Sequence, residues 1–236
     1  MKNITVLSSR LTITVALFVS VAASPLALGG TITDGFEGAS INPFWTASGP
    51  GTETLTSAVK HSGNQSVLFQ VSTTFPWNAD LDHDFGSEQF GSVSVFMLRP
   101  TGSSTSAAAL GINDIGAALA AIQQAPDGGY IARIRPGPNE RDVPFTSTSP
   151  NDWHMLEIDT AITGLTLRFD GVIVATDPSV TAFRLVELDN HGGPSGSAYF
   201  DDFSATTSPS PEPSTVVLLA LAGLAAAASR GLRTIK

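Results

Sequence analysis

Residues 164–175 read GLTLRFDGVIVA and carry the clearest structural signal in the sequence. Two short runs rich in Leu, Val, Ile and Phe, 164–169 and 172–175, flank the dipeptide Asp170-Gly171. Asp-Gly between two such runs is typical of a two-residue β-hairpin, because both positions of that turn need a positive φ. The stretch therefore predicts two antiparallel strands joined by a tight turn.

The same pattern extends along the chain in both directions from this hairpin. Gly, Ser, Thr, Pro and Asn recur about every 8–12 residues, and short β-branched or aromatic runs lie between them, as in an all-β sandwich. The Ala content of 107–125 also fits a helix, but Gly111, Asn113-Asp114 and Gly116 interrupt it, which favours two strands. Residues 136–150 are Pro-rich and predict a loop. The remaining strands are expected at 31–37, 52–59, 65–71, 80–85, 91–98, 130–135, 153–159, 183–189 and 198–205.

Several of these runs are similar to a known fold family. Trp153-His154, the stretch 165–174 and the stretch 198–203 (AYFDDF) resemble concanavalin A-like, or laminin-G-like, jelly rolls. Gly35-Phe36-Glu37 and residues 61–66 resemble the start of carbohydrate-binding jelly rolls. The resemblance implies a two-sheet antiparallel jelly-roll sandwich over residues 30–207, in a superfamily rich in sugar binders and glycosidases. Fold alone does not decide between those functions.

Residues 208–236 read SPSPEPSTVVLLALAGLAAAASRGLRTIK, a Pro-rich spacer followed by an apolar run and a basic end. The apolar run 216–228 is shorter than the roughly 20 residues that a membrane helix needs, which makes it a weak permanent anchor. A buried core helix is the alternative. The stretch resembles a PEP-CTERM sorting tail, which implies cleavage by an exosortase, a membrane-embedded cysteine protease, and transient membrane insertion of residues 215–229 as a helix. The residues that carry this resemblance are Pro211, Glu212, Pro213, Ser214, Arg230 and Arg233.

The other end of the chain agrees with export. Lys2 and Arg10 precede an apolar core at 11–23, and small residues follow, as in a signal peptide over residues 1–29. A lone membrane helix is the alternative. We therefore expect a signal helix, a domain at 30–207 and a sorting tail at 208–236. The protein would be membrane-anchored before processing, and would afterwards lie at the cell surface or in the extracellular matrix.

The composition limits the partners of the domain. Residues 30–207 hold seven Lys and Arg against twenty Asp and Glu, a net charge of −13, and the chain has no Cys. Such a surface repels nucleic acid and anionic lipid. Without Cys there is no disulfide, thiolate metal site or Cys nucleophile.

Catalytic patterns are weak. Retaining glycosidases on this fold use a strand motif Glu-x-Asp-x-x-Glu, and Glu157-Ile158-Asp159 supplies its first two carboxylates. Ile162 stands where the third would be, so the acid/base half of the pair is missing. There is also no Gly-x-Ser-x-Gly elbow for a Ser nucleophile. These observations predict that the protein is not an enzyme.

Two kinds of binding residue remain. Asp80, Asp82 and Asp84 alternate, but the spacing to Gly86 does not fit an EF-hand loop, so a polar strand face is the simpler interpretation. The jelly-roll resemblance instead implies a structural calcium ion held by Glu37 and one of Asp201 or Asp202, with no cofactor at all as the alternative. Trp45 and Trp153 stand beside strand starts and predict core positions, whereas Trp77 lies in a loop-like stretch and is the best sugar-stacking platform.

Together these features predict an exported protein that binds or structures exopolysaccharide without catalysis. The alternatives are a glycan-active hydrolase with an unrecognised site and a protein-interaction module. A hydrolase needs two carboxylates about 5–10 Å apart in a groove, whereas a sugar binder needs an open aromatic platform.

Overall fold

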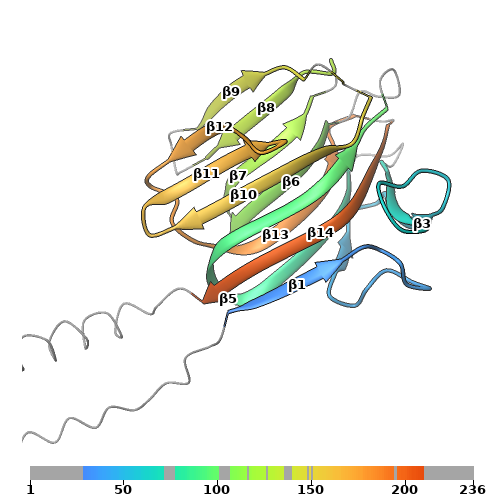
Figure 1. Ribbon diagram of the computed structural model, residues 1–236, viewed down its shortest axis with the longest axis horizontal. Helices are drawn as coiled ribbons and strands as arrows, with labels where there is room; N and C mark the ends of the chain where they lie inside the picture. Colours follow the sequence, from blue (N-terminus) through green and yellow to red (C-terminus); the bar gives the residue numbers. More distant parts are fainter. Residues whose placement is uncertain are drawn as a thin grey trace, which may run out of the picture.

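A computed structural model describes residues 29–71, 78–100, 107–115, 117–125, 127–135, 140–147, 149, 151–193 and 196–209. These residues form strands joined by turns and loops, with no helix among them (Figure 1). The strands are β1 (Gly30–Asp34), β2 (Thr46–Ser48), β3 (Thr52–Thr56), β4 (Ser66–Gln70), β5 (Asn78–Leu98), β6 (Ala107–Asp114), β7 (Ala117–Gln124), β8 (Tyr130–Ile134), β9 (Arg141–Phe145), β10 (His154–Ala161), β11 (Gly164–Phe169), β12 (Val172–Asp177), β13 (Phe183–His191) and β14 (Ser197–Pro209).

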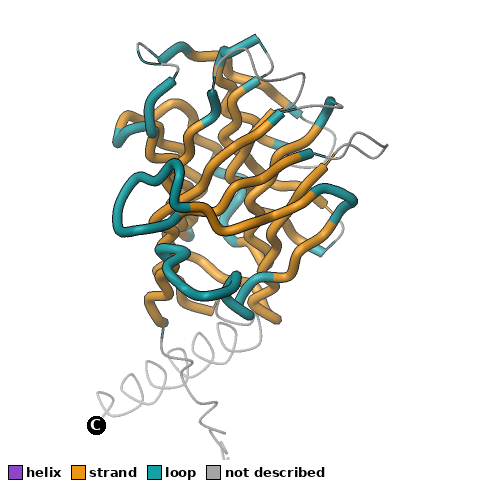
Figure 2. The backbone as a smooth tube through the Cα atoms, turned by 90° about the vertical axis from the view of Figure 1, so that its right-hand side faces the viewer, coloured by secondary structure: helices purple, strands orange, loops and turns teal. Residues whose placement is uncertain are grey.

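The strands pack in two layers (Figure 2). The long strand β5 belongs to both. Its first half pairs with β2 and with β13, and from β13 the first sheet continues through β6, β7 and β8 to β9. Its second half pairs with β10 and β14, in the second sheet, which also contains β11, β12, β1, β4 and β3. All pairings are antiparallel, so the predicted all-β jelly-roll sandwich is confirmed.

Gly91 lies where β5 passes from the first sheet to the second. Its φ is +137°, and a Cβ there would stand 2.1 Å from the carbonyl oxygen of Thr206. A side chain fits neither this conformation nor this space. The close approach of β14 to β5 therefore requires glycine at this position.

The core lies between the sheets and follows the two-residue period of the strands. In β6, for example, Ala108, Leu110 and Ile112 are fully buried and face inward. At one end Trp45 packs edge-on against Phe44 and Phe203, with ring centroids 4.9 and 4.7 Å away. Its indole Nε1–H donates to Asp34 Oδ2 at 2.9 Å. The prediction that Trp45 is a core residue is confirmed, whereas Trp153 is only half-buried.

The structure confirms two strands within 107–125 and corrects three other expectations. Residues 80–85 and 91–98 belong to the single strand β5, which continues across residues 86–90 although its pairing with β13 is irregular between Asp84 and Gln89. Residues 141–145 form β9 instead of a loop; Pro144 is tolerated there since β9 pairs only with β8, at the edge of the sheet. The last strand runs to Pro209, four residues past its expected end at 205.

Both expected terminal helices lie outside the described residues. Within the described part, no helix has the length and apolar character needed to cross a membrane.

The Asp170-Gly171 hairpin has the predicted geometry and yields a first test. The φ angles are +50° and +77°, and no atom lies within 4 Å of a Cβ placed on Gly171. A Gly171→Ala substitution therefore meets only backbone strain, and we expect it to lower the free energy of unfolding by about 1 kcal/mol. Urea denaturation measures this. Gly171→Asn should cost less, because Asn tolerates positive φ; equal stability of all three proteins would contradict the turn assignment.

Candidate functional site

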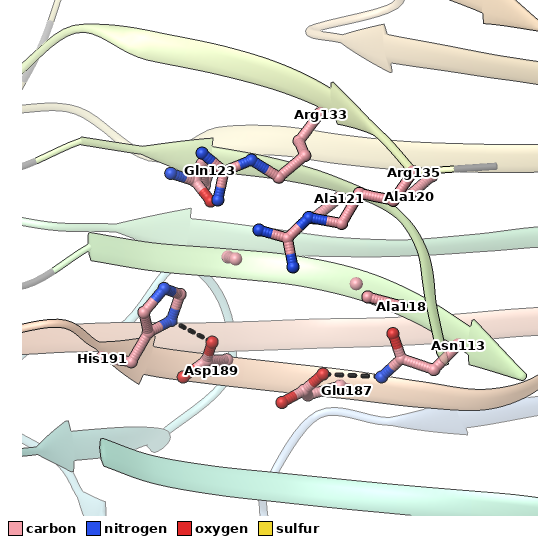
Figure 3. Close-up of a pocket in the computed structure, with 12 residues that line it drawn as sticks. Asn113, Ala118, Ala120, Ala121, Gln123, Arg133, Arg135, Glu187, Asp189 and His191 are labelled. Carbon is pink, nitrogen blue, oxygen red and sulfur yellow. Dashed lines mark hydrogen bonds and ion pairs between the residues drawn. The ribbon is translucent and has the colours of Figure 1, made fainter. Parts of the chain in front are cut away.

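A groove lies on the outer face of the first sheet, on the side away from the core. Since Ala108, Leu110 and Ile112 face inward, the alternate residues of β6 face outward, and two of them, Ala109 and Gly111, are small. Together with Ala121 of β7 they line the groove as its small residues, here called its floor. Figure 3 shows Ala121 between longer side chains.

The two walls of the groove differ in charge. Arg133 and Arg135, at the end of β8, and Gln123 of β7 stand on one side. Three alternate residues of β13 stand on the other: Glu187, Asp189 and His191. Figure 3 shows the guanidinium groups and the carboxylates on opposite sides of the floor.

The arginine wall is held in place by β9 and the residue before it. Arg133 donates from Nε and Nη2 to the two carboxylate oxygens of Asp142, at 2.8 Å each. Arg135 Nε lies 3.2 Å from Glu140 Oε1. Such bidentate and paired contacts fix the orientation of a guanidinium group. The strand that the sequence did not predict is therefore the one that positions this wall.

The opposite wall contains an acid cluster, formed by Asp80, Glu187 and Asp189. Asp80 of β5 is paired with Asp189 of β13 in the sheet. One carboxylate oxygen from each member lies within 4.8 Å of the others. Asn113 Nδ2 donates to Glu187 Oε2 at 2.7 Å, and His191 Nδ1 contacts Asp189 Oδ2. Asp80 Oδ2 accepts hydrogen bonds from Ser48 Oγ at 3.3 Å and from Asn78 Nδ2.

Burial and mutual repulsion dominate the electrostatics of the acid cluster. Burial raises the pKa of Asp80 and of Asp189, and neighbouring carboxylates raise both further. The pKa of Glu187 is also raised, first by burial, although the hydrogen bond from Asn113 opposes this. Burial lowers the pKa of His191. The three carboxyl groups therefore do not all carry a full charge without a compensating proton or cation.

The carboxylate pair singled out in the sequence lies elsewhere. Glu157 and Asp159 are on β10 of the second sheet, outside the groove. Both pair with Arg168; the Glu157 Oε1–Arg168 Nη1 distance is 2.7 Å. The same Glu-x-Asp pattern recurs at Glu187-Leu188-Asp189, where sequence reasoning missed it. The available signal was the alternation of polar residues from Glu187 to His191, which begins in the strand predicted at 183–189.

Glu37, Asp201 and Asp202 gather around the loop at residues 61–65. Glu37 Oε1 accepts from the backbone N–H groups of Asn64 and Gln65 at 2.6 and 3.0 Å. Asp201 Oδ2 accepts from the N–H groups of His61 and Ser62 at 2.8 and 3.1 Å, and Asp202 contacts the side chains of both. The structure thus brings the three acids to one loop. A calcium ion bound by them stays a prediction.

Two other predicted sites lie outside the described residues. Trp77 is the expected sugar platform, and the sorting motif with its basic end comprises Pro211, Glu212, Pro213, Ser214, Arg230 and Arg233. Both stay predictions.

His154 forms a Ser-His-Asp arrangement that does not fit nucleophilic catalysis. Its Nδ1 lies 2.7 Å from Asp170 Oδ2, and its Nε2 lies 3.2 Å from Ser147 Oγ and 2.7 Å from the carbonyl oxygen of Ser149. A carbonyl only accepts, so Nε2 must carry a hydrogen, and it cannot take the proton of Ser147. This histidine ties Ser147 and Ser149 to the β11–β12 turn.

No family model matches the chain, and no curated protein matches it. Solved structures do. The apo Crh5 transglycosylase is 17% identical with a TM-score of 0.57, covering 77% of this chain and 85% of that chain. A Bacillus licheniformis β-glucanase is 12% identical with a TM-score of 0.55, covering 75% and 98%. An endo-β-1,4-glucuronan lyase from Trichoderma reesei is 14% identical with a TM-score of 0.51, covering 70% and 90%. At these identities the likeness establishes the shared jelly-roll fold.

The names of these structures overturn the expectation that the protein is not an enzyme. That expectation rested on the missing carboxylate at Ile162, on a strand that lies outside the groove. The similar structures are named as a transglycosylase, a glucanase and a lyase. In this chain, the acid cluster supplies three carboxyl groups; only Asp80 among them was considered from the sequence, as part of a polar strand face.

Proposed function

We propose that this protein is a carbohydrate-active enzyme that binds a polysaccharide along the groove and hydrolyses a glycosidic bond there. The observation that carries this proposal is the placement of Glu187 and Asp189 side by side on one wall, facing Arg133 and Arg135 across a floor of small residues. The fold it shares with a glucanase and a transglycosylase adds support.

The spacing of the carboxyl groups favours one stereochemical course. Retaining glycosidases place their two carboxyl groups about 5–5.5 Å apart, whereas inverting enzymes leave about 6.5–9.5 Å for a water molecule. Carboxylate oxygens of Glu187 and Asp189 lie within 4.8 Å of each other, which suits retention through a covalent glycosyl-enzyme. Glu187, oriented by Asn113, is the nucleophile; Asp189, two residues along the same strand face, protonates the departing glycosidic oxygen. A water molecule, which gives its proton to Asp189, then breaks the bond between the sugar and Glu187 and restores both side chains.

The remaining groove residues bind the sugar chain. Arg133, Arg135 and Gln123 offer N–H donors to sugar hydroxyl groups, and the pairing of the arginines with Asp142 and Glu140 keeps them in place before substrate arrives. Ala109, Gly111 and Ala121 leave room for a sugar ring above the sheet.

A depolymerisation assay tests this function. The full chain, in the presence of a chelator, is incubated with a panel of neutral β-glucans, amino-sugar polymers and polyuronates, and new reducing ends are quantified. If the glycosidic bond is hydrolysed, we expect new reducing ends and no unsaturated product. Unsaturated products would show β-elimination instead, and no cleavage across the panel would contradict the enzyme assignment.

We also propose, from the sequence, that the protein is exported and sorted by its PEP-CTERM-like tail, which would bring the groove to exopolysaccharide outside the cell. Replacing Pro211, Glu212 and Pro213 with Ala should block processing, so most of the protein should keep its tail and stay in the membrane fraction. Intact-mass spectrometry of the producing cell's fractions measures this. Pro209→Ala, at the end of β14 and outside the motif, is the control. Normal removal of the tail from the triple variant would contradict the proposal.

A further inference from the structure

The acid cluster contains carboxylate oxygens that no hydrogen-bond donor reaches. Asp80 is only 5% exposed, yet its Oδ1 has no hydrogen-bond partner, while its Oδ2 accepts from Ser48 and Asn78. Asp189 Oδ1 is also buried without a partner. An unpaired buried carboxylate oxygen loses its hydration without compensation, so each of these atoms calls for a positive partner.

One proton shared between Asp80 and Asp189 can satisfy one of these oxygens, but the described surroundings of the cluster supply no Lys or Arg to it. Asp82 stands opposite Glu187 in the sheet, which adds another carboxylate. Among the described residues, the ion pairs of the cluster do not include any Lys or Arg; His191 contacts Asp189 alone. The nearby Arg133 and Arg135 are engaged by Asp142 and Glu140 on the far wall.

The chemistry and spacing of the cluster select the kind of cation. The three side chains offer oxygen ligands, which suit calcium or magnesium better than a transition metal. Calcium binds oxygen at about 2.3–2.6 Å, so ligands on opposite sides of the ion stand about 5 Å apart, whereas magnesium at about 2.0–2.1 Å brings them to about 4 Å. The three oxygens lie within 4.8 Å of one another, which either ion can span, but the flexible coordination of calcium suits an irregular set of carboxylates better than the strict octahedron of magnesium does.

We propose that Asp80, Glu187 and Asp189 bind a calcium ion on the acidic wall of the groove. This site is separate from the structural calcium predicted at Glu37 and Asp201. The consequence of the site for activity rests on the proposed function. Because Glu187 and Asp189 are ligands when calcium is bound, they are then withdrawn from the sugar, and calcium inhibits hydrolysis.

Calorimetric titration of the chelator-treated full chain with calcium chloride tests the site directly. The wild-type protein should bind calcium, and Asp80→Asn should weaken that binding at least about 10–100-fold. Calcium should raise the melting temperature of the wild type, since a ligand that binds only the folded state stabilises it, and should raise that of the variant by less. The variant should fold, because the amide keeps the shape of the side chain and removes a buried like charge. Magnesium chloride should bind more weakly than calcium.

Two control variants make the result specific. Asp84→Asn changes a carboxylate of the same strand that is bound by Arg184 at 2.8 Å and lies outside the cluster, so calcium binding should persist. Glu37→Gln tests the other predicted site and should leave the signal that depends on Asp80. Undiminished binding by Asp80→Asn, or no binding by the wild type, overturns the inference. If the wild type binds calcium as expected but cleaves no glycan, the calcium site stands and the enzyme assignment fails.

Discussion

Replacing Glu187 with Gln is expected to lower kcat for glycan cleavage at least about 1,000-fold, because the neutral amide can neither attack the anomeric carbon nor exchange a proton. The substitution keeps the size of the side chain, and Asn113 can still contact it. The measurement is the initial rate of reducing-end release from the best substrate of the panel, at saturating concentration and in chelator. Little change in substrate binding is expected alongside the loss of rate.

Glu157→Gln is the matched control for this experiment. Glu157 also stands in a Glu-x-Asp pair on a sheet surface, but it contacts Arg168 on the second sheet, outside the groove. Its replacement should leave the rate unchanged. Circular dichroism of both variants checks that they remain folded. A wild-type rate for Glu187→Gln would remove Glu187 from the mechanism and leave the groove without its proposed nucleophile.

The sequence predicts the sandwich well because its signals are local. The two-residue alternation of β11, the apolar run of β12 and the turn at Asp170-Gly171 can be read within a dozen residues, and the structure has them where expected. The strand that the sequence failed to predict, β9, was missed for the same reason, because only local signals could be used. Pro144 argues against a strand when its neighbours are unknown, but pairing on one side only makes the missing N–H of β9 harmless.

The candidate site could not be predicted in the same way, because it depends on register between distant strands. Asp80 meets Asp189 only through the pairing of β5 with β13, and Arg133 faces them only because β6 and β7 intervene. In sequence, Asp80 belongs with Asp82 and Asp84 as one polar strand face. The structure divides that face: Asp80 joins the acid cluster, while Asp84 is exposed and binds Arg184.

The Ala-rich segment 107–125 has a similar explanation. Its small residues resemble a helix in composition, but on alternate positions they serve two different surfaces. Ala108, next to Leu110 and Ile112, fills the core, whereas Ala109 and Gly111 form the floor of the groove. Larger outward side chains there would fill the space that a sugar chain needs. The composition that made the segment ambiguous is therefore what gives the groove its depth.

The largest loss of stability is expected from Trp45→Ala, at about 3–5 kcal/mol. Trp45 is 6% exposed, and its ring packs against Phe44 and Phe203, so its removal leaves a cavity that the two sheets cannot close. Urea denaturation of the full chain gives the change in the free energy of unfolding. It is monitored by circular dichroism of the backbone, because tryptophan fluorescence would change with the substitution itself.

Trp45→Phe separates the ring from its hydrogen bond. It keeps most of the packing but removes the Nε1–H donor, so the buried Asp34 carboxylate retains only the backbone N–H of Phe36. We expect a loss of about 1–3 kcal/mol, smaller than that of Trp45→Ala. Equal losses in the two variants would show that the hydrogen bond to Asp34, and not the aromatic packing, determines stability at this end of the sandwich. Because Trp45 does not line the groove, the folded fraction of either variant should cleave glycan at the wild-type rate.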